Sequence, residues 1–320
     1  MFSLNIDVSA WEKVPVPDSV DKKTKSPWNF FEDFEDQKKE KLKLKKLTIN
    51  NKGAGLKPFK IKQDLDGNKY LEVTVKHGWN NDPYKKKGKE TERAEFQTKQ
   101  KRTLNKEIWI GFKMRLPKDF IHINDRVLFF QFKNQHDPMK KSPLLGIRFY
   151  ENGNLLNIAG DTGGVASRSW NKKEDTIHSI KLIYKKNKNF WYVDREKNRN
   201  EDYEDLHFKL KKKGNLIFKL TPNKSFKVTN LGEWTTYKIG IHNSKKEDGF
   251  VKVYKDDLLI FDYNGVTFDW KGKYTGSYVR IGLYRDSGKR TGKKYPDQVI
   301  HFDNFTVVSD KKTLDKYLDK

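Results

Sequence analysis

Three short segments combine large polar side chains with a regular alternating spacing. They are ERAEF at 92–96, VLFFQFK at 127–133 and YVRIGLYR at 278–285. In each segment large polar residues alternate with apolar ones, as on a β-strand with two different faces. The polar positions are Arg93, Glu95, Gln131, Lys133, Tyr278, Arg280 and Tyr284. Arginine, glutamine and tyrosine on neighbouring strands are more typical of a sugar-binding floor than of a plain solvent face.

Strict alternation predicts which residues share that floor. Arg93 and Glu95 lie opposite Ala94 and Phe96. In the second segment one face holds Val127, Phe129, Gln131 and Lys133, and the other holds Leu128, Phe130 and Phe132. In the third segment one face holds Tyr278, Arg280, Gly282 and Tyr284, and the other holds Val279, Ile281 and Leu283. If the polar faces align on one sheet, they line a groove while the apolar faces enter the core.

The rest of the chain is typical of an all-β protein. Short segments rich in Val, Ile, Phe, Tyr and Trp recur between turn residues, and helical periodicity is nearly absent before the last ten residues. Strands are predicted at 70–75, 108–116, 144–150, 179–185, 189–193, 235–242, 249–255, 258–263 and 298–308, with a hairpin turn at Asp256-Asp257. We therefore predict a two-sheet antiparallel β-sandwich of the jelly-roll type at 28–310, an N-terminal extension at 1–27 and a C-terminal tail at 311–320.

Composition limits the partners. The formal net charge is +24, and a field of that strength attracts polyanions such as nucleic acids, anionic membranes or acidic glycans. The basic runs at 85–89, 140–141, 211–213 and 289–294 fall in predicted loops, where they serve a solvated surface equally well. The absence of cysteine excludes disulfides, thiolate catalysis and cysteine-ligated zinc. No nucleic-acid motif or transmembrane stretch is visible, so neither nucleic acid nor membrane is an expected partner.

The three polar segments, in this order, resemble signature strands of the jelly-roll polysaccharide lyases. The heparin lyase I-like family and, more distantly, the family 7 alginate lyases carry R-x-E, Q-x-H and Y-x-K-x-G-x-Y strands. The matching segments are RAE at 93–95, QFK at 131–133 and YVRIGLY at 278–284. Residues 232–257 and 300–307 resemble later parts of the pattern, so the resemblance runs from about Leu47 to Val308. It implies a concanavalin A-like jelly roll with a groove on its concave sheet.

The resemblance implies cleavage of a uronic-acid-containing polysaccharide by β-elimination. Losing the C5 proton of a uronate places charge on the neighbouring carboxylate, which the enzyme must neutralise. Gln131 matches the neutralising glutamine, with Arg93 beside it, and Tyr284 matches the catalytic tyrosine as base, acid or both. Arg280 stands where the family has lysine and is expected to hold a substrate carboxylate. Glu95 is expected to orient Arg93.

One position departs from the family pattern, because Lys133 replaces the histidine of Q-x-H. Three options follow: Tyr284 performs both proton steps, Lys133 is the base, or a histidine reaches in from elsewhere, with His136 the nearest. The departure also fits a protein that binds glycan without cleaving it. Tyr278, His136 and Arg285 complete the residues expected to contact substrate.

Other candidate residues carry weaker expectations. Trp79, Trp170 and Trp191 are candidates for stacking on sugar rings, whereas Trp109 and Trp234 are expected to pack. No cofactor is required, although Asp303 and Asn304 offer oxygen ligands of the kind that a structural calcium ion takes.

Three functions compete at this point. The first is a lyase acting on a glycosaminoglycan, glucuronan or alginate, and the second is a non-catalytic glycan-binding or virion attachment protein with the same fold. The third is a nucleic-acid binder, which only the charge supports. We expect a monomer. The family implies a secreted or periplasmic protein, but the first residues lack the pattern of a signal peptide, so a virion-associated or cytoplasmic location stays open.

Overall fold

The fold is seen in a computed structural model. It describes residues 29–37, 47–50, 58–79, 91–123, 125–137, 143–150, 155–160, 182–184, 191–193, 207–210, 214–217, 228–246, 248–265, 267–268, 273–288 and 292–318. The expected extension at 1–27 lies outside these ranges.

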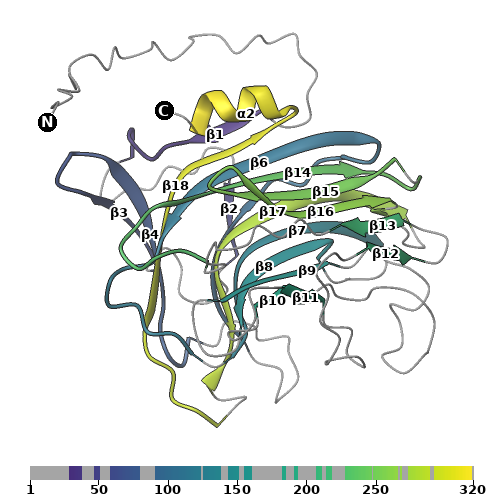
Figure 1. Ribbon diagram of the computed structural model, residues 1–320. Coiled ribbons are helices and arrows are strands. Elements are labelled where there is room, and N and C mark those ends of the chain that lie inside the picture. The colour runs from purple at the N-terminus through teal and green to yellow at the C-terminus, as the bar shows by residue number, and fades with distance from the viewer. Residues whose placement is uncertain are drawn as a thin grey trace, which may run out of the picture.

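Within the described residues, two antiparallel sheets form a sandwich (Figure 1), which confirms the predicted all-β fold. The larger sheet has the order β12-β13-β16-β15-β14-β6-β18-β4-β3, with β1 paired to β18. Its strands are β1 (Phe30–Glu32), β3 (Phe59–Gln63), β4 (Lys69–Val75), β6 (Lys106–Arg115), β12 (His207–Leu210), β13 (Gly214–Ile217), β14 (Thr235–Asn243), β15 (Phe250–Lys255), β16 (Leu258–Gly265) and β18 (Gln298–Val308).

The smaller sheet has the order β2-β5-β17-β7-β8-β9 and contains all three polar segments. Its strands are β2 (Leu47–Asn50), β5 (Thr91–Thr98), β7 (Val127–Asp137), β8 (Leu145–Tyr150), β9 (Leu155–Gly160) and β17 (Lys273–Asp286). Strands β10 (Leu182–Tyr184) and β11 (Trp191–Val193) pair with each other. The central strand β17 lies between β5 and β7, so the three predicted polar strands are neighbours.

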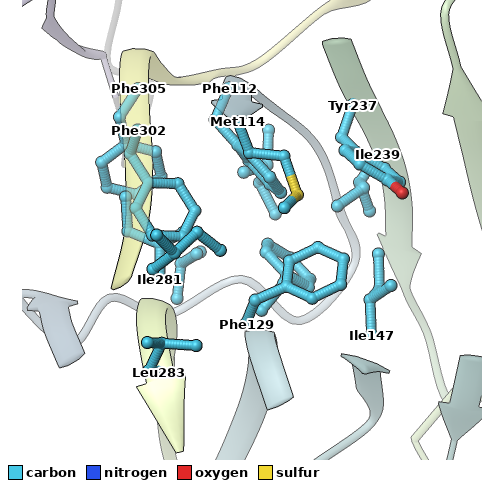
Figure 2. Packing of buried hydrophobic residues seen from close by; sticks show 14 of the residues in the cluster. Phe112, Met114, Phe129, Ile147, Tyr237, Ile239, Ile281, Leu283, Phe302 and Phe305 are labelled. Atoms are coloured by element: carbon cyan, nitrogen blue, oxygen red, sulfur yellow. The ribbon is translucent and has the colours of Figure 1, made fainter. Parts of the chain in front are cut away.

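Apolar side chains from the two sheets meet in one core (Figure 2). Phe112 on β6 contacts rings from both sheets, with centroids 5.6 Å from Phe130 on β7 and 5.5 Å from Tyr237 on β14. Ile281 and Leu283 reach the same core from β17. Burial of this many large side chains, each worth roughly 1.5–3 kcal/mol, fixes the register of the strands that carry the polar face.

The hairpin between β15 and β16 turns at Asp256 and Asp257, as predicted. Both residues have positive φ, 47° and 62°, which is the requirement of a type I′ turn. Aspartate tolerates this conformation better than most residues. The Asp256 carboxylate also accepts a hydrogen bond from the Thr236 backbone N–H at 2.8 Å.

The residues expected as a C-terminal tail form helix α2 (Lys311–Leu318), which packs on the larger sheet (Figure 1). Asp310 caps it, since its carboxylate accepts the Thr313 backbone N–H at 2.8 Å. Leu314 and Leu318 lie over Gly111 of β6, where a Cβ atom would come within 2.4 Å of Leu318. Trp109 joins this cluster, which agrees with its expected packing role.

Candidate active site

The register of β5, β17 and β7 gathers the predicted polar residues on one face of the smaller sheet, called the polar face below. Tyr284 pairs with Arg93, and Gly282 pairs with Glu95. On the other side of β17, Arg280 pairs with Gln131. Ala94, Phe96, Ile281 and Leu283 lie in the core, as alternation predicts.

Glu95 is the centre of this face and is only 2% exposed. Its carboxylate accepts a hydrogen bond from Gln131 Nε2. The same carboxylate lies 3.9 Å from Arg93 Nη1 and 4.0 Å from Arg280 Nη1. A buried carboxylate is tolerable when cations and donors compensate it, as they do here. The predicted role of Glu95 in orienting Arg93 fits this geometry, and Glu95 holds Gln131 and Arg280 as well.

Gly282 makes this convergence possible. Glu95 and Gln131 belong to strands on opposite sides of β17, and Gly282 lies opposite Glu95 without a side chain to separate them. A Cβ atom at Gly282 would come within 2.2 Å of the Ala94 carbonyl oxygen and 2.7 Å of Glu95 Cα. Its φ of 142° is also one that other residues rarely adopt.

Tyr284 lies between two arginines. The Arg93 guanidinium carbon is 4.2 Å from the centroid of its ring, and that of Arg126 is 5.0 Å away. Arg126 Nη2 donates a hydrogen bond to the phenol oxygen at 3.2 Å and another to Asp286 at 2.6 Å. Positive charge at this position stabilises negative charge that develops on the phenol oxygen during proton transfer.

Sequence reasoning missed Arg126, because a β-bulge breaks the alternation of β7. The pairing with β8 shifts between Leu128 and Phe130, so that Phe129 and Phe130 both enter the core. The prediction that Val127 and Phe129 share a face with Gln131 was therefore wrong, since both lie in the core. Leu128, predicted to face the core, instead lies outside the core cluster and pairs with Tyr284.

The environment of Arg126 keeps it charged. Burial alone lowers its pKa, but the nearby Tyr284 and Asp286 outweigh burial and raise the pKa above its ordinary value. The Nε atoms of Arg126 and Arg93 are buried without a hydrogen-bond partner in the described part of the chain.

Arg280 and Tyr278 extend the polar face along β17. Arg280 Nε donates to Gln97 at 2.9 Å, and its guanidinium carbon lies 4.8 Å from the Tyr278 ring. Burial raises the pKa of Tyr278, although Arg280 works in the opposite direction. Tyr278 is therefore held as a neutral phenol, which suits packing and hydrogen bonding better than proton transfer.

Lys133 lies apart from Tyr284. It pairs with Tyr278, and Tyr284 is six residues further along β17. At ~3.3 Å per residue this is roughly 20 Å of backbone along the strand, whereas Gln131 pairs with Arg280, four residues from Tyr284. His136 pairs with Tyr274, still further from Tyr284, and its side chain lies outside the described residues.

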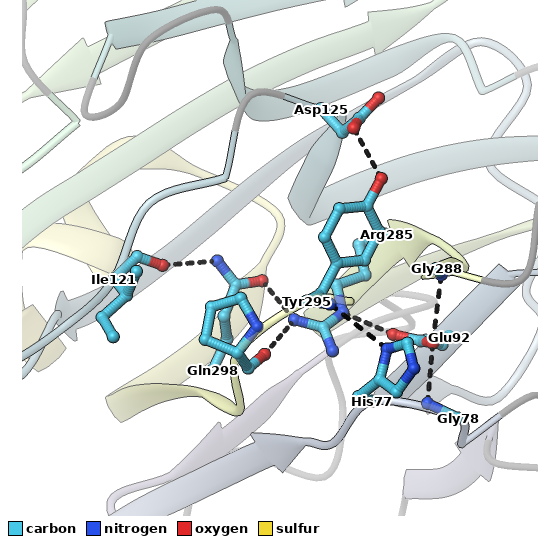
Figure 3. A network of polar contacts seen from close by, with 10 residues as sticks. His77, Gly78, Glu92, Ile121, Asp125, Arg285, Gly288, Tyr295 and Gln298 are labelled. Atoms are coloured by element: carbon cyan, nitrogen blue, oxygen red, sulfur yellow. Dashed lines mark hydrogen bonds and ion pairs between the residues drawn. The ribbon is translucent and has the colours of Figure 1, made fainter. Parts of the chain in front are cut away.

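Arg285 was predicted to contact substrate, but it faces the interior of the protein. Its side chain is fully buried, and its Nε donates to Glu92 at 2.7 Å. Its Nη1 donates to the Pro296 carbonyl at 2.7 Å and to Gln298 at 3.0 Å (Figure 3). Burial lowers the pKa of Arg285, and Glu92 opposes this effect. Arg285 therefore joins β17 to β5 and to the segment before β18, and the prediction of a substrate contact there was wrong.

The same polar network reaches the residue next to Arg126. The Tyr295 backbone N–H donates to His77 Nδ1 at 3.2 Å, and the Tyr295 hydroxyl donates to Asp125 (Figure 3). Lys293 Nζ lies 3.0 Å from the same carboxylate. Asp125 immediately precedes Arg126, so the network fixes the segment that carries Arg126.

Asp303, considered above as a calcium ligand, lies on β18 with its carboxylate engaged in hydrogen bonds. Its carboxylate accepts hydrogen bonds from Asn68 Nδ2 at 3.2 Å and from the Asn304 backbone N–H at 2.7 Å. Burial raises the pKa of Asp303 to about 6, so the group readily carries a proton. Within the described ranges, no group of three or more His, Asp or Glu residues is placed to hold a metal ion.

The tryptophans considered for stacking on sugar or for packing differ in their surroundings. Trp234 packs against Tyr70, with ring centroids 5.6 Å apart, and under Arg115, as expected of a packing residue. Trp79 is half-buried, with Lys76 Nζ 5.9 Å from its ring centroid. Trp170 and the Trp191 side chain lie outside the described residues.

The helices that the structure describes include none with the length and apolar character needed to cross a membrane.

Comparison with known proteins identifies the family. A family model described as polysaccharide lyase matches residues 58–306, so this protein belongs to the polysaccharide lyase family. No curated protein matches the chain.

One solved structure supports the fold, and two others are similar at lower TM-scores. The chain is similar to an endo-β-1,4-glucuronan lyase from the fungus Trichoderma reesei, with a TM-score of 0.51, 14% identity, and coverage of 82% of this chain and 90% of that chain. It is also similar to alginate lyase A1-II′ of polysaccharide lyase family 7, with a TM-score of 0.46, 11% identity, and coverage of 78% and 83%. An alginate lyase from Pseudomonas aeruginosa has a TM-score of 0.41, 12% identity, and coverage of 78% and 86%.

Proposed function

We propose that this protein cleaves a uronic-acid-containing anionic polysaccharide by β-elimination, with Tyr284 as the proton-transfer group. The observation that carries the proposal is the Tyr284 phenol between Arg93 and Arg126, beside the Glu95 cluster. A phenol flanked by cations suits a group that must give up and regain a proton. Membership of the polysaccharide lyase family supports the same reaction.

The reaction divides into two proton movements and one bond cleavage. Tyr284, as phenolate, takes the proton from C5 of the uronate, and the electrons of that C–H bond form the C4–C5 double bond. The C4–O4 bond breaks, and the departing oxygen receives a proton from the same phenol. The substrate carboxylate carries negative charge during proton loss, and Arg93 and Gln131 are the groups that neutralise it.

The position of Lys133 supports a single tyrosine for both proton steps. Lys133 pairs with Tyr278 and lies far along the strand from Tyr284, so it suits contact with a neighbouring sugar unit more than with C5. Arg280, on the polar face between them, suits a second carboxylate of the chain. A polymer with repeated carboxylates would then contact cations along β17.

The substrate class is the finer part of the proposal. The similar structure from Trichoderma reesei is named a glucuronan lyase, and we propose an unsulfated uronan of the glucuronan or alginate type as the first substrate. A sulfated glycosaminoglycan, the substrate implied by the heparin lyase I-like resemblance, is the second.

The test is to incubate the protein in turn with glucuronan, alginate, hyaluronan, heparan sulfate and heparin. β-Elimination leaves an unsaturated uronate, which absorbs in the ultraviolet, so an absorbance increase on one polymer names the substrate. No increase on any of them, together with measurable binding, would favour the non-catalytic glycan-binding alternative.

A further inference from the structure

We infer that Arg126 is a further catalytic residue of this site, one that holds the Tyr284 phenol oxygen and stabilises its negative charge. The inference rests on the proposed function, since it assigns a role in that proton transfer. No segment that resembles the lyase signature strands contains Arg126, and it precedes β7.

The contacts of Arg126 favour this role. Its Nη2 donates to the phenol oxygen at 3.2 Å while its guanidinium carbon stays 5.0 Å from the ring centroid. Asp286 accepts from the same nitrogen at 2.6 Å and fixes the direction of the guanidinium. Among the described residues, the charged groups around the phenol include Arg93 from β5, Arg126 before β7 and Asp286 from β17, and Glu95 lies beside Arg93. Arg126 is the cation that contacts the phenol oxygen itself, where negative charge must develop.

The fold holds Arg126 in place from two directions. The bulge at Phe129 turns the chain so that Leu128, two residues after Arg126, pairs with Tyr284. On the other side, Tyr295 and Lys293 bind the Asp125 carboxylate. A residue that is fixed from both neighbours is typical of a preorganised site, in which the charge is present before the reaction begins.

The first experiment compares steady-state kinetics of Arg126→Ala with those of the unchanged protein on the substrate found above. We expect kcat to fall by roughly 10²-fold, with KM changed less than about threefold, because the lost contact acts on the reacting phenol. Added guanidinium ion should restore at least a tenth of the lost rate, and Arg126→Lys should retain more activity than Arg126→Ala. Arg115→Ala is the matched control, since Arg115 also stacks on aromatic rings but on the larger sheet, and guanidinium should not change its rate.

A second experiment needs no catalysis. In protein carrying ¹³Cζ-labelled tyrosine, the Tyr284 resonance is assigned by its loss in Tyr284→Phe and followed with pH. Tyr284 should ionise at higher pH in Arg126→Gln than in the unchanged protein. Equal ionisation in both, or a kcat that survives Arg126→Ala, would overturn the role of Arg126. An inactive unchanged protein in which Arg126→Gln still shifts ionisation would instead remove the proposed function alone.

Discussion

Glu95 joins the residues of the polar face into one unit. Its two carboxylate oxygens serve Gln131 on one side and Arg93 and Arg280 on the other. Because Glu95 is buried, its charge is strongly felt by these partners, and their side chains lose the freedom to leave the face. A substrate carboxylate that approaches Arg93 or Gln131 therefore meets groups that are already oriented.

The raised pKa of Asp303 predicts that the unfolding free energy depends on pH. Burial raises its pKa from the ordinary 3.8 to about 6, so the folded protein keeps a proton that the unfolded chain releases near pH 4. The contribution of Asp303 to stability should therefore fall as pH rises from about 4 to about 6 and stay level above. Asp303→Asn should remove this loss and raise the unfolding free energy at pH 8 by about 1–3 kcal/mol.

Urea unfolding at pH 4.5 and pH 8 measures the Asp303 effect. The Asn68 amide can rotate to offer its oxygen to the amide introduced at position 303, so the packing is kept. Asp66→Asn is the control, because Asp66 is exposed on the turn before β4. An equal gain at both pH values would contradict the assigned cause.

The individual residues of the site were predictable where alternation is regular. Arg93, Glu95, Arg280 and Tyr284 could be placed on one face from their spacing alone. Arg126 could not, because strict alternation places it on the core side with Phe130, and only the bulge at Phe129 reverses this. For Arg285 the regular alternation was correct, because it places Arg285 with Leu283 in the interior. The predicted substrate contact overlooked this and the buried Glu92 that compensates its charge.

At the scale of elements, strand β17 carries both the polar face and its support. One of its faces presents Tyr278, Arg280 and Tyr284, while Arg285 on the other pairs with Glu92 of β5. The strands themselves were predictable from short apolar segments, and so was the hairpin at Asp256-Asp257. The prediction missed strands β1, β2, β3, β9, β12 and β13. No local pattern predicts a bulge, because bulges arise from pairing between distant strands.

The Arg285–Glu92 pair should behave as a structural element. Both side chains are fully buried, so Arg285→Met leaves an unpaired buried carboxylate and should lower the unfolding free energy by about 3–5 kcal/mol. The double variant Arg285→Met with Glu92→Gln should lose less than the sum of the two single variants, since the second change removes the orphaned charge.

Denaturant unfolding of the four proteins in this cycle gives the coupling energy. Arg115→Met, which removes a half-buried arginine stacked on Tyr70 and Trp234, serves for comparison and should cost far less. A stable Arg285→Met protein with weakened substrate binding would restore Arg285 as a substrate contact and contradict our correction.

At the scale of the whole molecule, the net charge of +24 favours a polyanionic partner. The sandwich places Arg93, Arg126, Arg280 and Lys133 on or beside one face of the smaller sheet. The fold class was predictable because the composition, the strand pattern and the motif order all agree. The charge alone did not distinguish glycan from nucleic acid, whereas the match to the polysaccharide lyase family favours a glycan.

Salt should therefore weaken binding of the substrate. If two to three cations are neutralised on binding a single-chain polyanion, raising the salt from about 50 to about 200 mM should increase Kd roughly 7- to 18-fold. Calorimetric titration of the uronan with Tyr284→Phe measures this without turnover. A Kd that does not change with salt would mean that the polar face contributes little to binding.

Replacing Tyr284 by phenylalanine is the sharpest test of its role in proton transfer. The variant removes one oxygen and keeps the ring between Arg93 and Arg126. Formation of unsaturated uronate and equilibrium binding of the same polymer should be measured on both proteins. We predict that product formation falls by roughly 10²–10⁴-fold while Kd changes less than about threefold. Undiminished product formation by Tyr284→Phe would contradict the account, since another group would then have to take the C5 proton.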